Sequence, residues 1–87
     1  MKALEQLIQQ QNKWNQIFNG RQYEIRTAEG RKAVAEHIDS RLSPENLTCD
    51  GELSRTEVAR RYKELTQAAR ELVALDPSVA QYIYELA

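Results

Sequence analysis

The sequence is poor in the residues that build most active sites. Its 87 residues include one histidine, His37, and one cysteine, Cys49. A single cysteine excludes an intramolecular disulfide, and one histidine with one cysteine cannot supply the ligands of a zinc cage. A nucleophilic hydrolase needs a base held beside its nucleophile, and only His37 is available for that role. We interpret His37 as a surface or boundary residue and Cys49 as a tolerated small residue, and we expect neither catalysis nor a cofactor.

Glycine and long apolar runs are also scarce. The three glycines stand singly, so no glycine-rich loop is present to cradle a phosphate. The residues around Asp50-Gly51-Glu52 lack the alternating oxygen ligands of a calcium loop. No stretch approaches the roughly 20 apolar residues that span a bilayer, and the N-terminus lacks the unbroken apolar run of a signal peptide. We therefore expect a cytoplasmic protein with no membrane partner and no small-molecule substrate.

Neither sign of charge dominates. Twelve basic and thirteen acidic side chains give a formal net charge of −1, so no global field draws the chain toward nucleic acid. Residues 45–64 are mixed as well, with five acids and four bases. A hydrophobic fraction of 41% favours a folded chain over a disordered one. At this length, one domain over residues 1–87 is the natural interpretation, with a core too small to enclose a substrate pocket.

Helical periodicity is what the sequence does contain. It predicts an all-α fold, a small bundle of about four helices over approximately residues 2–18, 28–42, 55–75 and 77–87, with a short helical turn near 44–47. Thr27 suits the cap of the second helix, and Asn19-Gly20 suits the end of the first. The Gln and Asn residues of the first helix are expected to form a solvated face. Its apolar residues gather on the other side: Leu4, Leu7, Ile8, Trp14, Ile17 and Phe18.

The clearest helix start lies at residues 53–58. Ser54 and Glu57 have the spacing of a capping box, and Leu53 and Val58 flank them as a hydrophobic staple. From there, apolar residues step by four, three, four and three, which is the spacing of helix-on-helix packing: Val58, Tyr62, Leu65, Ala69 and Leu72. Asp76-Pro77 supplies a cap and a first-position proline for the last helix.

Residues 21–26 alternate as an extended strand does, with Tyr23 and Ile25 on one side. No second alternating run is visible to pair with them. We therefore predict an extended connector that these two side chains pin to the core. The alternative is that the segment pairs with a copy of itself across a dimer.

The aromatic residues carry the functional prediction. Tyr82 and Tyr84 are two positions apart on a predicted helix, so they cannot both face the core, and we expect one to be exposed. Trp14 and Phe18 lie one turn apart, where core packing is the first expectation and docking the alternative. We predict a non-enzymatic interaction or regulatory protein that presents a helical surface to another protein or to itself, as a homo-oligomer. Its candidate contact residues are these four aromatic residues.

The alternative function is that of a small DNA-binding transcriptional regulator. Residues 53–62 look like the first helix of a helix-turn-helix, but residues 63–70 continue the helical period without the turn that a recognition helix requires. The candidate cations lie on the basic side of the 55–75 helix and are Arg55, Arg60, Arg61 and Lys63. For Arg60, Arg61 and Lys63 the other interpretation is salt bridges to nearby acids such as Glu57 and Glu64. The balanced charge makes nucleic acid the less favoured partner.

Overall fold

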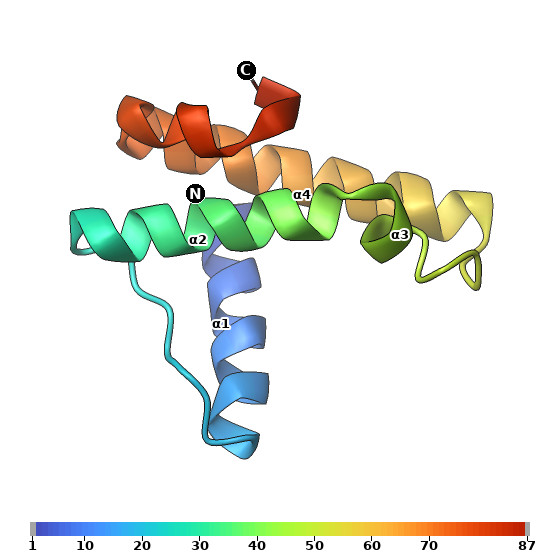
Figure 1. Ribbon diagram of the computed structural model, residues 1–87, viewed down its shortest axis with the longest axis horizontal. Coiled ribbons are helices and arrows are strands. Elements are labelled where there is room, and N and C mark those ends of the chain that lie inside the picture. Colours follow the sequence, from blue (N-terminus) through green and yellow to red (C-terminus); the bar gives the residue numbers. More distant parts are fainter. Residues whose placement is uncertain (1, 87) are drawn as a thin grey trace.

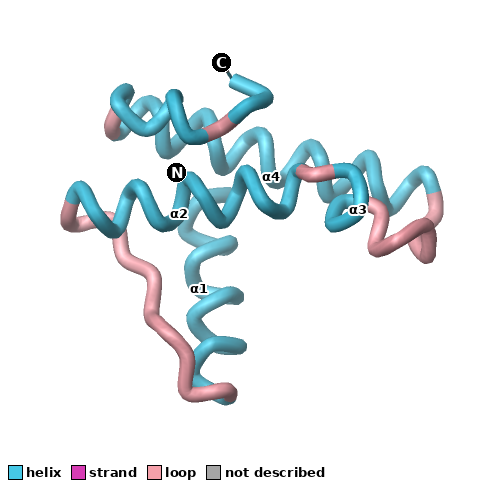
Figure 2. The backbone as a smooth tube through the Cα atoms, in the orientation of Figure 1, coloured by secondary structure: helices cyan, strands magenta, loops and turns pink. Residues whose placement is uncertain are grey.

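Three long helices form the frame of the protein. The computed structural model describes residues 2–86, in which these helices are α1 (Lys2–Ile17), α2 (Ala28–Leu42) and α4 (Arg55–Leu75). A single turn, α3 (Pro44–Leu47), follows α2, and two 3₁₀ helices, η1 (Pro77–Tyr82) and η2 (Tyr84–Leu86), come last. Figure 2 shows loops but no strand between these elements, which confirms the predicted all-α class for the described part of the chain.

The helices do not all lie parallel. In Figure 1, α2 and α4 run side by side in opposite directions, and the two 3₁₀ helices lie over them at the C-terminal end. α1 stands across this pair, with its N-terminal end against it and its C-terminal end pointing away. The connector after α1 runs back alongside that helix to the start of α2. The outer half of α1 therefore projects from the rest of the fold.

The core lies where α1, α2, α4 and η1 meet. Small residues at the centre, Ala35, Ala68 and Ala69, have no exposed surface and let the helix backbones approach closely. Leu4 is the one fully buried residue of α1, so this helix contributes to the core mainly through its first turns. The other core side chains are Val34, Ile38, Leu42, Leu65, Leu72, Val79 and Ile83.

The capping residues lie where the sequence predicts them. The Thr27 hydroxyl accepts from the Gly30 N–H at 3.0 Å, and the Ser54 hydroxyl accepts from the Glu57 N–H at 3.3 Å. Glu57 pairs with Arg60 at 2.5 Å, so only the serine half of the capping box is formed within the described residues. These contacts fix the first turns of α2 and α4 locally, which explains why both starts match the prediction.

The C-terminal segment differs from the prediction of one helix over 77–87. Ile83 has φ −118° and ψ 105°, an extended conformation that separates η1 from η2. This break turns the Ile83 side chain fully into the core and leaves Tyr84 outside, with the Tyr84 N–H donating to Asp39 Oδ1 at 3.0 Å. Burial of Ile83 has therefore overridden the helical period. Ala87 lies outside the described residues.

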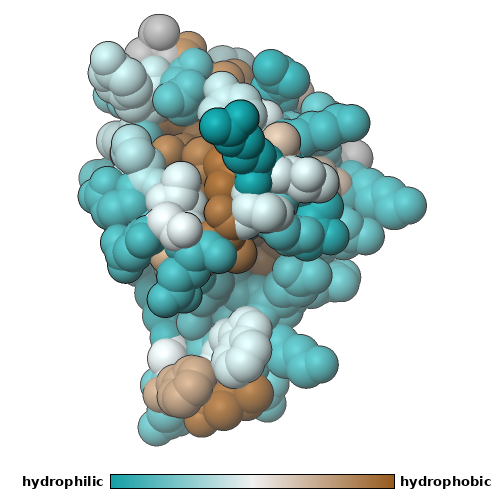
Figure 3. All heavy atoms as spheres, turned by 90° about the vertical axis from the view of Figure 1, so that its right-hand side faces the viewer, coloured by the Kyte–Doolittle hydropathy of each residue, from teal (hydrophilic) through white to brown (hydrophobic). Residues whose placement is uncertain are grey.

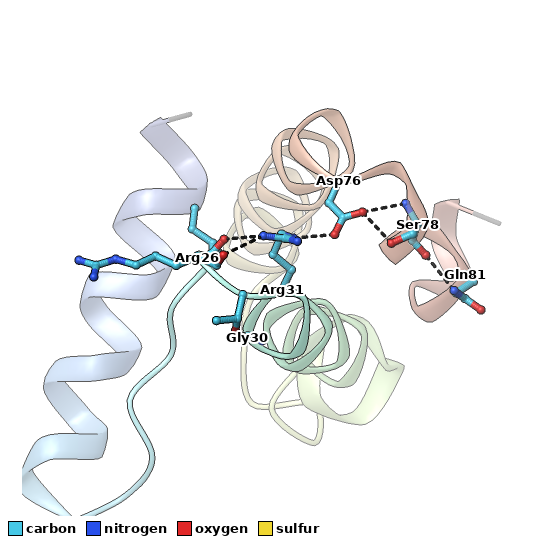
Figure 4. Close-up of polar contacts among 8 residues, drawn as sticks. Arg26, Gly30, Arg31, Asp76, Ser78 and Gln81 are labelled. Carbon is cyan, nitrogen blue, oxygen red and sulfur yellow. Dashed lines mark hydrogen bonds and ion pairs between the residues drawn. The ribbon is translucent and has the colours of Figure 1, made fainter.

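Arg31 joins three parts of the fold (Figure 4). Its Nε pairs with Asp76 Oδ2 at 2.6 Å, and its Nη1 donates to the carbonyl of Ile25 at 3.1 Å. The other oxygen of Asp76 accepts from the N–H and hydroxyl of Ser78. The Ser78 hydroxyl and the Arg31 guanidinium together lower the pKa of Asp76. The end of the connector, the first turn of α2 and the corner between α4 and η1 are thus held at one point.

Gly30 provides a stability test of this packing. A Cβ at this position would overlap the carbonyl oxygen of Glu24, so the connector or α2 must shift to admit one. In an open helix, alanine is favoured over glycine by about 1 kcal/mol. Here we expect Gly30→Ala to lower the free energy of unfolding in urea by about 1–3 kcal/mol. Gly20→Ala, whose Cβ would meet nothing closer than 3.4 Å, is the control. A more stable Gly30→Ala protein would contradict the close approach.

Candidate functional site

Three large apolar side chains lie in solvent at the projecting end of α1. Trp14 is 60% exposed, Ile17 65% and Phe18 74%. The Trp14 and Phe18 rings stack with centroids 6.2 Å apart and planes 9° apart. We call these three residues the α1 tip. Figure 3 shows brown and pale atoms gathered at the lower end of the molecule, where α1 ends.

The expectation that Trp14 and Phe18 pack in the core is wrong. The two residues share a face with Leu4, but α4 and α2 pass only the beginning of α1. Past that crossing, the apolar stripe of α1 has no helix beside it within residues 2–86. A helical period shows which side of a helix is apolar, whereas burial also depends on how far the neighbouring helices extend.

The amide residues of α1 hold the connector, so the expectation of a merely solvated face is wrong for two of them. Asn12 Nδ2 donates to the Tyr23 carbonyl at 2.9 Å, and Asn12 Oδ1 accepts from the Tyr23 N–H at 2.6 Å. Asn15 Nδ2 donates to the Arg21 carbonyl at 2.6 Å. Tyr23 and Ile25 pack half-buried against the core, which confirms the prediction of a pinned connector. Pairing of this segment across a dimer stays a prediction.

The surroundings of the α1 tip are basic. Between residues 9 and 23 the only charged side chains are Lys13 and Arg21, and neither forms an ion pair within the part of the chain that the structure describes. A groove of about 360 Å³ runs from Trp14 along α1 toward Arg41 and Arg61. Arg61 Nε is buried there without a hydrogen-bond partner among residues 2–86. Among residues 2–86, Glu64 is the one acid lining this groove.

The two tyrosines of the candidate set lie apart from the α1 tip. Tyr82 is half-buried against the core, with Lys32 Nζ 5.2 Å from the centre of its ring. Tyr84 is 84% exposed, which confirms the prediction that one of the pair faces solvent. Tyr82 therefore has a packing role, and Tyr84 is a single exposed aromatic ring away from the tip.

The four candidate DNA contacts spread around α4. At about 100° per residue, Arg55, Arg60, Arg61 and Lys63 span roughly two-thirds of the helix circumference. Arg60 forms an ion pair with Glu57, as the salt-bridge interpretation predicts. Arg61 Nη2 donates a hydrogen bond to the Asn46 carbonyl at 3.4 Å. α4 is unbroken from 55 to 75, so this stretch is not divided into the two helices of a helix-turn-helix. These cations form no single strip.

His37 and Cys49 both lie at the boundary of the fold. The His37 ring lies 5.2 Å from the ring of Tyr23, and burial together with the charge of Arg41 lowers the pKa of this histidine. Cys49 is half-buried in a left-handed turn, with φ 50°, and its Sγ lies 3.9 Å from the Asn46 carbonyl oxygen.

Among residues 2–86, no three histidine, cysteine or acidic side chains are placed to hold a metal ion. Nor does any described helix have the length and apolar character to cross a bilayer.

The exposure of the α1 tip predicts that it adds little to stability. Substituting an exposed side chain usually changes the free energy of unfolding by less than about 0.5 kcal/mol. We therefore expect Phe18→Ser to unfold in urea almost as the unmodified protein does. Leu4→Ala, at a fully buried position in the first turns of α1, should cost about 2–5 kcal/mol. Similar losses for both variants would place Phe18 inside the fold.

His37 predicts a pH dependence of stability. Its pKa is lower in the folded state than the ordinary value of 6.5, so the unfolded chain binds the proton more tightly. The contribution of neutral His37 is therefore full above about pH 6.5 and is lost as the pH falls below it. We expect the urea midpoint to decline between about pH 7.5 and pH 5.5, above the range where most carboxyl groups titrate. His37→Gln should flatten this decline, and an unchanged decline would assign it to other groups.

Comparison of the chain with protein-family models, curated proteins and solved structures found no match. The α1 tip is the largest cluster of exposed aromatic and aliphatic side chains that the packing of the fold does not explain, since Trp14, Ile17 and Phe18 are large, apolar and exposed together.

Proposed function

We propose that this protein is a non-enzymatic, cytoplasmic interaction protein with a regulatory or adaptor role, and that it docks through the α1 tip. The observation that supports this is the exposure of Trp14, Ile17 and Phe18 within one and a half turns of helix. Clustered apolar exposure of this kind marks binding surfaces in soluble proteins. Burying a side chain such as Ile17 or Phe18 against a partner is favourable by up to about 1.5–3 kcal/mol before the cost of association is subtracted.

The tip has the chemistry of an interface anchor. Tryptophan is enriched among the residues that dominate binding energies, and large apolar side chains fill the pockets around them. The stacking of Trp14 on Phe18 reduces the freedom that these rings lose on docking. Asn12 and Asn15 lie on the same turns of α1 as Trp14, and their hydrogen bonds tie these turns to the connector. The tip is thus a preorganised projection.

A photo-crosslinking amino acid at position 18 tests this proposal in cells. Position 9, an exposed glutamine two and a half turns earlier on the opposite side of α1, is the matched control. We expect crosslinking from position 18 to give a discrete protein adduct, either another protein or a second copy, that position 9 does not give. Trp14→Ser in the same chain should remove the adduct. A diffuse background of equal strength at both positions would overturn the proposal.

A further inference from the structure

The molecule carries an apolar groove at the start of α4, separate from the groove beside α1. It has a volume of about 480 Å³ and is lined chiefly by Leu47, Leu53, Val58, Ala59 and Tyr62. We call it the α4 groove. In Figure 3, brown atoms lie in the middle of the face that shows α3 and the start of α4, between teal side chains. The groove is therefore an apolar hollow with a polar border.

The α4 groove lies on a part of the apolar seam of α4 that no neighbouring long helix covers within residues 2–86. Val58 and Tyr62 belong to the same apolar seam as Leu65 and Leu72, but Leu65 and Leu72 are buried whereas Tyr62 is 42% exposed. The part of the seam nearest the start of α4 is flanked by α3 and the 48–54 turn and is not covered by a long helix within residues 2–86. Where the apolar residues of a helix extend beyond the helix packed against them, a side chain from another molecule can pack there instead.

We propose that the α1 tip of one copy of this protein occupies the α4 groove of a second copy. This rests on the proposed function and names the partner. The tip is a convex cluster of apolar side chains, and the groove is a concave apolar surface of the size of a ligand pocket. The chain thus carries both halves of one contact. In Figure 1 the C-terminal end of α1 points away from α3 and the start of α4, so a tip does not reach the groove of its own chain.

The charges around the two surfaces are complementary. Lys13 and Arg21 flank the tip, with no acid between residues 9 and 23. The segment 44–54, which borders the α4 groove, carries three acids and no base: Glu45, Asp50 and Glu52. None of these five side chains forms an ion pair within residues 2–86. Among the described residues that line the groove, Arg55 is the one cation, and Arg61 lies beside the segment, where its Nη2 donates to the Asn46 carbonyl. Opposite potentials of this kind favour tip-to-groove docking over tip-to-tip docking.

The exchange is reciprocal. Figure 3 shows the tip and the apolar hollow on one face of the molecule, so two copies related by a two-fold axis can each place a tip in the groove of the other. Reciprocity doubles the contact, which matters because one tip of three side chains makes a small interface. The product is a closed dimer, not an open chain.

Sedimentation velocity over a range of protein concentrations tests this directly. We expect a monomer–dimer equilibrium that weakens as salt is added, because screening reduces the attraction between the two charged borders. Phe18→Ser, in the tip, and Ala59→Lys, which fills the groove from an exposed position, should each raise the dimer dissociation constant about tenfold or more. Tyr84→Ser and Ala74→Lys, at exposed positions outside both surfaces, are the matched controls and should leave it unchanged. Circular dichroism checks that each variant is folded.

Mixing the two interface variants distinguishes tip-to-groove docking from other modes. The Ala59→Lys copy retains a tip and the Phe18→Ser copy retains a groove, so an equimolar mixture regains one of the two contacts. We expect the mixture to dimerise more strongly than either variant alone. Loss of dimer with Phe18→Ser but not with Ala59→Lys would show tip-to-tip packing and overturn the inference.

A charge exchange tests the complementary borders. Lys13→Glu should weaken the dimer, and adding Glu52→Lys to the same chain should restore part of the loss. No recovery would contradict the role given to the 44–54 segment.

A protein that stays monomeric at every concentration overturns the self-docking inference. If position 18 still crosslinks to a different protein, the proposed function stands without self-docking.

Discussion

The two hydrogen bonds between the side chain of Asn12 and the backbone of Tyr23 are the contact on which the shape of this molecule depends. One amide group both donates to and accepts from the same residue, as a neighbouring strand would. The backbone N–H and carbonyl of Tyr23 are thereby paired without a sheet, which holds the connector against α1. Because no other helix flanks the outer half of α1 within residues 2–86, the connector is its structural support. The position of the α1 tip depends on this support.

The other end of the connector is fixed by Arg31, which binds its carbonyls and the carboxylate of Asp76 together. The close approach of Gly30 to Glu24 holds the same turn. The connector is thus held at both ends by polar contacts and in its middle by Tyr23 and Ile25. This arrangement sets the direction in which α1 leaves the core.

The sequence predicts those parts of the fold that local chemistry decides. Thr27 and Ser54 act on N–H groups three residues away, so the starts of α2 and α4 could be predicted without knowledge of the rest. The end of α1 is set by Asn19, whose φ of 60° suits that residue type. The break at Ile83 could not be predicted, because it results from the reach of that side chain to a distant core. The partner of Asn12 was missed for the same reason, since an amide in a helix gives no sign of which backbone it binds.

The sequence identifies which residues form the candidate site, but it does not predict whether their side chains are buried or exposed. Trp14 and Phe18 have the spacing of core residues, and Val58 and Tyr62 have it too, yet all four lie where a helix extends past its neighbours. Periodicity has no information about where a partner helix ends. The charge pattern was hidden in a similar way, because residues 45–64 are balanced only when the acids of the turn are counted with the bases of α4. When the sequence is divided at the start of α4, the 44–54 segment has a net negative charge and residues 55–64 have a net positive charge. A net charge near zero is therefore consistent with strongly directed association, since attraction between surfaces depends on how charge is distributed and not on its sum.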